Sequence, residues 1–397
     1  MHSYGGVILI VTKGEPVINR IAAVKNNEKW PGPVYVTYYI SGICNLNYLF
    51  CLMPQKVKSV ISEGKSDELL DSFESISCLF IMGAEPAIHP ELTNHILKYA
   101  NNRNIPVKFD TNGFAPLDCY IRLLKDVPPE KIEKITVSID SMVPEIHNKL
   151  RQNENSLRNA LNCVNFLKEK GYAVRVQMTV CDINYDSILY SVNKLYEEYK
   201  VDRFGFHCAS VGGEAKRNKI KHLNAFKWRR MVQSLYELQK NIKVEEFSVP
   251  VIAMTKNELK RLYFADGHLA DEYEKSLVAD KGSGANFSKL CAALKQEFCY
   301  LIGYEKEGTI TLCEGLAHAK GTSFSVFDSE QKKFTINTGS TSDINAINRS
   351  KFLCPAMVED TGNSNGYEVN SKGEKLFYVC RHIIVPREEL DDIDFVE

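Results

Sequence analysis

Cysteine is the residue type in this chain with the greatest capacity for chemistry. The 397 residues include 12 cysteines, and thiolates bind zinc ions and iron–sulfur clusters. No signal-peptide pattern is present, so we expect a cytoplasmic protein whose cysteines do not form disulfides. Cys78 and Cys181 lie in strand-like runs and Cys163 lies on a helical pattern, and all three are interpreted as small core residues. The candidates for chemistry are Cys44, Cys51, Cys291, Cys299, Cys313, Cys354 and Cys380.

These cysteines need structural elements to position them, and the first 245 residues predict a regular alternation of strands and helices. Predicted strands cover 34–40, 78–82, 107–111, 134–140, 172–180 and 203–208. Predicted helices cover 56–73, the segment after Pro90, 153–170, 184–199 and 222–240. Six strand–helix units in a row favour a parallel sheet with right-handed crossovers. They are fewer than the eight of a closed barrel, so we expect an open (β/α)6 TIM-like partial barrel.

The rest of the chain predicts separate units around this barrel. Residues 1–33 indicate a small N-terminal β-hairpin, and residues 34–245 form the barrel. Residues 246–288 are interpreted as a helical linker that ends in the Gly/Ser-rich sequence KGSGANFS. Residues 289–397 are rich in cysteine and turns, and we expect them to form a second domain.

Cys44 and Cys51 lie just after the first predicted strand, in the sequence SGICNLNYLFC. Their spacing resembles the C-x3-C-x2-C signature of the radical S-adenosylmethionine (SAM) family. In that family three thiolates hold a [4Fe–4S] cluster, and the fourth iron binds SAM. Here Tyr48 stands at the second ligand position. The resemblance implies Cys44, Tyr48 and Cys51 as the metal-binding set and SAM as cofactor.

Further motifs follow the next strands in the order of the family. Gly83-Ala84-Glu85-Pro86 resembles the GGEP element whose backbone contacts SAM, and Val211-Gly212-Gly213 is a weaker likeness after the sixth strand. We interpret His89 as a helix-start residue and not as a catalytic one. The resemblance implies cofactor contacts from Gly83, Ala84, Glu85, Pro86, Asn112, Ser138, Asp140 and Arg151, with Arg151 pairing with the SAM carboxylate.

The second domain resembles a SPASM domain, which carries two auxiliary clusters in many peptide-modifying relatives. Cys299 and the segment Gly308–Cys313 fit its G-x4-C hairpin, and Cys291 adds a ligand. Cys354 and Cys380 fit two of the later cysteines. The other three cysteine positions hold Met357, Asn363 and Tyr367. In sulfatase-maturing relatives a carboxylate after a cluster cysteine acts as a base, which makes Glu314 the catalytic candidate, although a surface turn residue explains it better.

Three hypotheses follow for function. The first is a pseudoenzyme that binds a peptide, SAM or an active maturase partner without competent clusters. The second is an active radical SAM enzyme that modifies a ribosomal peptide or protein side chain through an atypically ligated cluster. The third is a zinc-stabilised binding protein, in which the C-terminal cysteines supply a tetrahedral thiolate site.

Composition limits the remaining classes of partner. The net charge of -1, from 49 basic and 50 acidic residues, predicts no nucleic-acid footprint. Apolar runs are too short to predict a membrane span. The sequence leaves the oligomeric state open.

Overall fold

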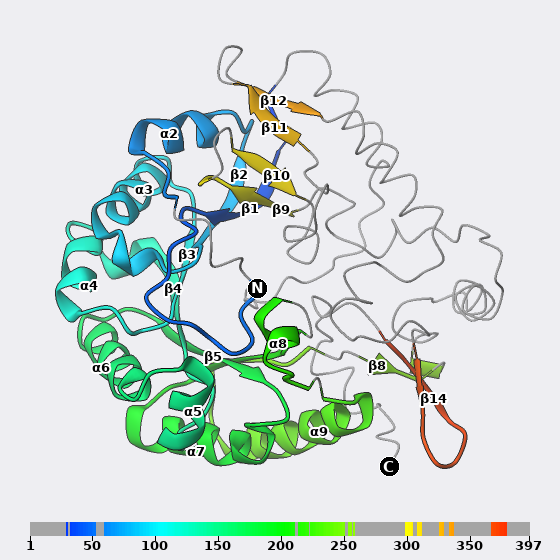
Figure 1. The fold of residues 1–397 in the computed structure, drawn as a ribbon. Helices are drawn as coiled ribbons and strands as arrows, with labels where there is room; N and C mark the ends of the chain where they lie inside the picture. The colour runs from blue at the N-terminus through cyan, green and yellow to red at the C-terminus, as the bar shows by residue number, and fades with distance from the viewer. Residues whose placement is uncertain are drawn as a thin grey trace, which may run out of the picture.

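A curved sheet with helices along its outer face dominates the structure, a computed structural model (Figure 1). It describes residues 29–30, 32–52, 59–210, 213–221, 223–250, 253–255, 257–258, 298–304, 308–311, 325–328, 333–336 and 367–378. The strands of its first part are β1 (Val34–Tyr39), β2 (Ile76–Met82), β3 (Val107–Thr111), β4 (Ile132–Ser138), β5 (Val174–Val180), β6 (Arg203–Cys208) and β7 (Glu246–Ser248). The helices are α2 (Glu63–Asp71), α3 (Pro90–Asn102), α4 (Leu117–Leu123), α5 (Pro144–Arg151), α6 (Ser156–Glu169), α7 (Ile188–Tyr199), α8 (Gly213–Arg217) and α9 (Ala225–Asn241).

Later residues contribute further strands. They are β8 (Ala253–Met254), β9 (Phe298–Ile302), β10 (Thr309–Thr311), β11 (Ser325–Asp328), β12 (Lys333–Ile336), β13 (Tyr367–Val369) and β14 (Lys375–Tyr378). The large sheet has the order β12-β11-β10-β9-β1-β2-β3-β4-β5-β6-β7, and β13-β14-β8 form a small second sheet. Neighbours from β9 through β7 pair in parallel. The predicted α/β partial barrel is therefore confirmed.

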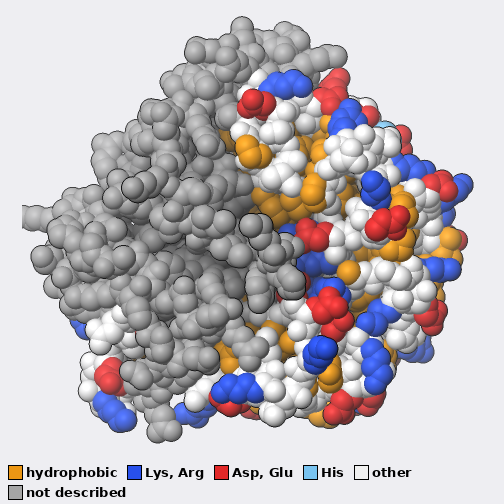
Figure 2. All heavy atoms as spheres, turned by 180° about the vertical axis from the view of Figure 1, so that it is seen from behind, with side chains coloured by type: hydrophobic (Ala, Val, Ile, Leu, Met, Phe, Trp, Pro, Cys, Tyr) orange, Lys and Arg blue, Asp and Glu red, His pale blue; other side chains and the backbone are white. Residues whose placement is uncertain are grey.

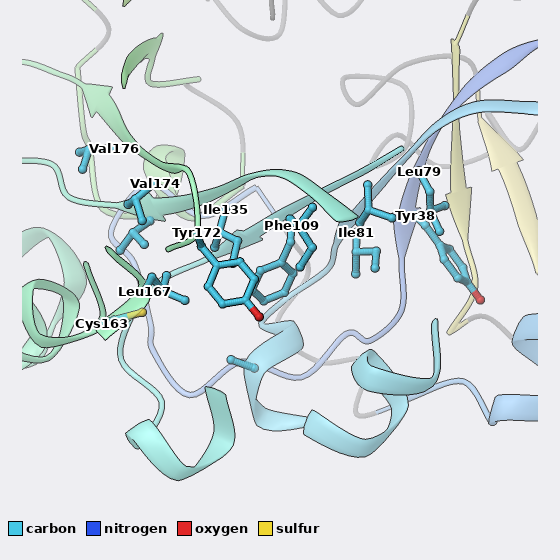
Figure 3. Packing of buried hydrophobic residues seen from close by; sticks show 14 of the residues in the cluster. Tyr38, Leu79, Ile81, Phe109, Ile135, Cys163, Leu167, Tyr172, Val174 and Val176 are labelled. Atoms are coloured by element: carbon cyan, nitrogen blue, oxygen red, sulfur yellow. The ribbon is translucent and has the colours of Figure 1, made fainter. Parts of the chain in front are cut away.

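The alternation of side-chain direction along the strands explains which residues form the core. Every second residue of β3, β4 and β5 faces the helices, as Phe109, Ile135 and Val176 do, and Leu167 of α6 packs in the same cluster (Figure 3). These side chains are fully buried. Helix α6 buries residues at the three- and four-residue spacing of an amphipathic helix, and it ends just before Gly171 as predicted.

Several elements differ from the prediction. Helices α4 and α5 are only 7 and 8 residues long and were not predicted, because such short segments show little periodicity. Strand β7 lies at the start of the predicted helical linker, and β8 follows in the same segment. Strand β9 pairs in parallel with β1 and so extends the barrel sheet, although it lies in the predicted second domain. The domain boundaries stay a prediction.

Two predicted segments fall largely outside the described residues, the N-terminal hairpin and the charged helical stretch at 256–280. On the described surface in Figure 2, basic and acidic side chains are interspersed. Among the helices that the structure describes, none combines the length and apolarity needed to cross a bilayer.

Candidate functional site

The candidate site surrounds the segment 41–52, which follows β1 and is called here the cysteine loop. The backbone of Ser41 accepts a hydrogen bond from Ala84 N at 2.8 Å, and that of Ile43 accepts one from Glu85 N at 3.1 Å. Gly83 has φ +153°, and a Cβ there would lie 3.0 Å from Ser41 O. The Gly-Ala-Glu motif therefore packs directly against the start of the cysteine loop, an approach that glycine permits.

Cys44 and Tyr48 lie together in this loop. The hydroxyl of Tyr48 is 3.8 Å from Sγ of Cys44, which also accepts a hydrogen bond from Leu46 N at 3.4 Å. Burial and the nearby Glu85 carboxylate raise the pKa of the Cys44 thiol. Burial also raises the pKa of the Tyr48 phenol well above its ordinary value. In the absence of a metal ion, this pair is therefore a neutral thiol next to a neutral phenol.

A buried arginine holds the ring of Tyr48 in place. The guanidinium carbon of Arg151 lies 4.2 Å from the centroid of the Tyr48 ring and 5.5 Å from that of Phe50. Nε of Arg151 donates to Oδ2 of Asp140 at 2.6 Å, and both side chains are almost fully buried. Asp140 also accepts from Thr179 N at 3.0 Å. Arg151 is thus already neutralised by a carboxylate of the protein.

Tyr48 is also part of a small apolar cluster. It packs with Leu49 against buried residues of the same loop and of later segments. These are Phe50, Leu150, Cys181, Ala209, Ala215 and Ile220. Leu49 N donates to Leu150 O at 2.9 Å, which ties the loop to the end of α5. Tyr48 therefore fills space as a packed aromatic side chain.

Cys51 is fixed by the start of α8, a contact that sequence reasoning mostly missed. Glu214 N donates to Cys51 O at 2.9 Å, and a Cβ on Gly213 would lie 2.5 Å from the same oxygen. Gly213 has φ +53°, which favours glycine. Asn218 adds a hydrogen bond from Nδ2 to Leu49 O at 3.1 Å. The Val-Gly-Gly sequence at 211–213 was the one available signal.

The carboxylate of Glu85 joins the ends of β2 and β3. It accepts hydrogen bonds from Ala87 N at 2.9 Å, Thr111 Oγ1 at 2.7 Å and Asn112 N at 2.7 Å. Burial raises its pKa to about 7, while these three hydrogen bonds act in the opposite direction. The carboxylate of Glu85 is therefore occupied by hydrogen bonds within the protein, whichever groups the backbone of this residue contacts.

The two polar residues at the next strand ends differ. Asn112 Nδ2 donates to Asn45 Oδ1 at 2.8 Å and lies 3.7 Å from Cys44 Sγ, so Asn112 steadies the cysteine loop. Its Oδ1 accepts from Phe114 N at 2.8 Å. Ser138 is half-buried, and its hydroxyl makes no hydrogen bond within the described residues. The SAM contacts of Asn112 and Ser138 stay predictions.

His89 begins helix α3, as predicted, and it has a second contact. Its Nε2 lies 2.8 Å from Ser41 Oγ, which also accepts from Ile43 N at 3.0 Å. Burial lowers the pKa of His89, which favours the neutral imidazole. His89 thus ties the start of the cysteine loop to α3.

The C-terminal candidates are not brought to this site in the described residues. Cys299 lies on β9 and is 1% exposed within the main apolar core. Cys291, Cys313, Glu314, Cys354 and Cys380 lie outside the described residues. No group of three or more His, Cys, Asp or Glu side chains suited to a metal ion occurs in the part of the chain that the structure describes.

Residues 38–195, which include the cysteine loop and most of the barrel, match the family model of the radical SAM superfamily. This segment is therefore similar to the radical SAM superfamily. The antilisterial bacteriocin subtilosin biosynthesis protein AlbA of Bacillus subtilis is 26% identical over 180 residues, 44% of this chain and 39% of AlbA. The aligned part therefore spans well under half of AlbA.

Solved structures of radical SAM proteins share the fold at low sequence identity. Streptococcus suis SuiB bound to the precursor peptide SuiA has a TM-score of 0.53 at 15% identity, covering 90% of this chain and 73% of SuiB. SuiB bound to S-adenosylmethionine gives the same TM-score and identity over 89% of this chain. Native anSMEcpe with bound AdoMet has a TM-score of 0.51 at 12% identity, covering 83% of this chain and 88% of anSMEcpe.

The radical SAM superfamily implies SAM and an iron–sulfur cluster as cofactors. The donor set of the cysteine loop does not fit a cluster held by three thiolates of that loop. Positions 44 and 51 supply sulfur, but position 48 supplies a phenol whose ring is packed against Arg151. A neutral phenol is a harder and weaker ligand for an iron–sulfide cluster than a thiolate is.

Proposed function

We propose that this chain is a pseudoenzyme of the peptide-maturase lineage of radical SAM proteins, which binds a peptide or an active maturase partner without standard cluster chemistry. The observation that carries the proposal is the position of Tyr48. Its ring is packed with Phe50 and stacked by Arg151, and its hydroxyl lies beside Cys44. The relationship to AlbA and the fold shared with SuiB support the choice of a peptide as partner.

The surrounding ion pair strengthens this proposal. Nε of Arg151 is bound by Asp140 at 2.6 Å and only 3% of the arginine side chain is exposed, so its charge is already balanced by a buried carboxylate of the protein. Breaking such a pair by removing one partner costs about 3–5 kcal/mol. The tyrosine, arginine and aspartate therefore form one packed unit at the place of the second thiolate.

Two variants of Tyr48 separate the possible roles of this residue. Wild-type protein, Tyr48→Cys and Tyr48→Phe are purified without oxygen, reconstituted with iron and sulfide, and assayed for both elements. We expect Tyr48→Cys to hold about four more irons per chain than wild type, the content of one cubane. Because all three proteins share the C-terminal cysteines, iron bound there cancels in the difference.

Tyr48→Phe is the matched control, since it keeps the ring and removes only the hydroxyl. If Tyr48 is a packing residue, this variant retains the iron content of wild type. Loss of about four irons from Tyr48→Phe, or SAM cleavage by reduced wild type that depends on Cys44, contradicts the pseudoenzyme.

An active enzyme with an atypically ligated cluster is the second candidate. Leu46 N donates to Cys44 Sγ at 3.4 Å and Asn112 Nδ2 lies 3.7 Å from it, and these two contacts favour the thiolate against the larger opposing effect of burial on the pKa of Cys44. A third proposal is that zinc stabilises the C-terminal region. A zinc assay on the same samples tests this proposal, and about one zinc per chain without iron supports it.

A further inference from the structure

Three charged side chains meet inside the barrel, far along the strands from the cysteine loop. Nζ of Lys134 on β4 lies 2.8 and 2.7 Å from the two carboxylate oxygens of Glu246 on β7. Nε of Arg175 on β5 lies 3.1 Å from Oε1 of the same glutamate. The side chains of Lys134, Arg175 and Glu246 are 7%, 13% and 13% exposed.

All three lie on the inner face of the sheet. Their strand neighbours Ile135 and Val174 pack into the core beneath the helices (Figure 3). Because successive side chains of a strand point to opposite faces, Lys134 and Arg175 point into the barrel. They lie near the N-terminal ends of their strands, whereas the cysteine loop follows the C-terminal end of β1.

The contact between Lys134 and Glu246 depends on curvature. Their strands are separated by β5 and β6 in the sheet order. On a flat sheet three strand spacings amount to about 14 Å, and side chains stand perpendicular to the sheet. A lysine and a glutamate whose side chains extend in parallel from a flat sheet do not bridge that distance. The 2.7 Å contact therefore exists because the inner faces of β4 and β7 turn toward each other.

Gly205 makes room for the contact between Arg175 and Glu246. A Cβ on Gly205 of β6 would lie 1.8 Å from Nη2 of Arg175 and 2.4 Å from Oε1 of Gln177. The guanidinium of Arg175 thus lies directly over the backbone of β6 on its way to Glu246. The other inward candidate on β6, Arg203, pairs instead with Asp202 at 3.2 Å and with Glu245.

We propose that Lys134, Arg175 and Glu246, with the space left by Gly205, form a clasp that sets the curvature of the second half of the barrel and holds the edge strand β7 in place. Strand β7 has only 3 residues and pairs on one side with β6. Such a short edge strand gains little from its ladder, so the buried charges add to the attachment that Phe247 gains by packing on Phe204, Phe206 and Tyr236. The clasp concerns the barrel itself and operates whether or not a cluster binds.

Amide hydrogen exchange in the full chain tests the clasp. Glu246→Asp keeps the charge but shortens the side chain, and Gly205→Ala pushes the end of Arg175 off β6. In both variants we expect exchange at 246–248 to accelerate by at least about tenfold, while exchange in β1–β3 stays at the wild-type rate. Local opening of β7 is the signature, because general destabilisation accelerates all strands alike.

Arg203→Gln is the matched control, since it removes a more exposed pair between β6 and Glu245, the residue that precedes β7. Pairs of that kind contribute little, so exchange at 246–248 should change by less than about threefold. Unchanged exchange at 246–248 in Glu246→Asp and Gly205→Ala, or equal acceleration across β1–β6, overturns the clasp.

Discussion

At the scale of single residues, Glu85 combines complete burial with a charge that the protein must accommodate. Three donors contact its carboxylate, yet burial dominates and raises its pKa to about 7. Asn112 N is held by one carboxylate oxygen and Thr111 Oγ1 by the other. The protonation state of one side chain is therefore coupled to the geometry of two strand ends next to the cysteine loop.

This coupling predicts a pH dependence of stability. Between about pH 4.5 and 7 the folded protein keeps a proton on Glu85 that the unfolded chain releases. The contribution of Glu85 to the free energy of unfolding therefore falls as pH rises through this window, by on the order of 3 kcal/mol, and levels off above pH 7. Urea unfolding of wild type and Glu85→Gln at pH 5, 6 and 7.5 should show a difference that changes with pH.

The exposed Glu169 provides the control for that measurement. Glu169→Gln should differ from wild type by the same small amount at each pH. A pH-independent difference for Glu85→Gln would show that its carboxyl titrates alike in the folded and unfolded chain.

At the scale of elements, glycine positions decide where loops meet helices. Gly113 follows β3 with φ +73°, and a Cβ there would lie 2.8 Å from Cα of Ala160 in α6. We expect Gly113→Ala to lower the free energy of unfolding by about 2–4 kcal/mol, through backbone strain and overlap with a helix backbone that cannot yield. Chemical denaturation measures this loss.

Gly64 is the matched position, because it lies in α2 with no atom near its would-be Cβ. Gly64→Ala should stabilise the protein by about 0.5 kcal/mol, since alanine loses less backbone entropy in a helix. Equal effects of the two substitutions would contradict the packing argument for Gly113.

At the scale of the whole molecule, β9 joins residues 298–302 to the barrel sheet beside β1. Leu301 of β9 is fully buried in the main core, and Tyr35 of β1 pairs in register with Phe298. We expect Leu301→Ala to lower the free energy of unfolding by about 2–5 kcal/mol and to speed amide exchange in β1. Val369→Ala, at a half-exposed position on β13, should change stability by less than about 0.5 kcal/mol. Normal exchange in β1 of Leu301→Ala would show that β9 only rests against the barrel.

The sequence predicted which loops form the site, but it predicted few of the side-chain contacts within it. The loops after β1, β2, β3 and β4 were correctly predicted as neighbours, because parallel strands place their C-terminal ends on one face. The pairing of Arg151 with the SAM carboxylate stays a prediction, and sequence reasoning did not foresee that its Nε binds Asp140 and its guanidinium lies over Tyr48. Which partner a buried charge takes depends on packing that a motif does not encode.

The sequence by itself determined the six strands from β1 to β6, the longer helices between them and the residues of the cysteine loop, because alternation and helical spacing are local properties of the chain. Only the tertiary structure decided that β9 lies next to β1, that Tyr48 is packed beneath Arg151, and that Lys134 reaches Glu246 from 112 residues away. Each of these contacts joins segments far apart in the chain. Their formation depends on the curvature of the whole sheet, which no short stretch of sequence specifies.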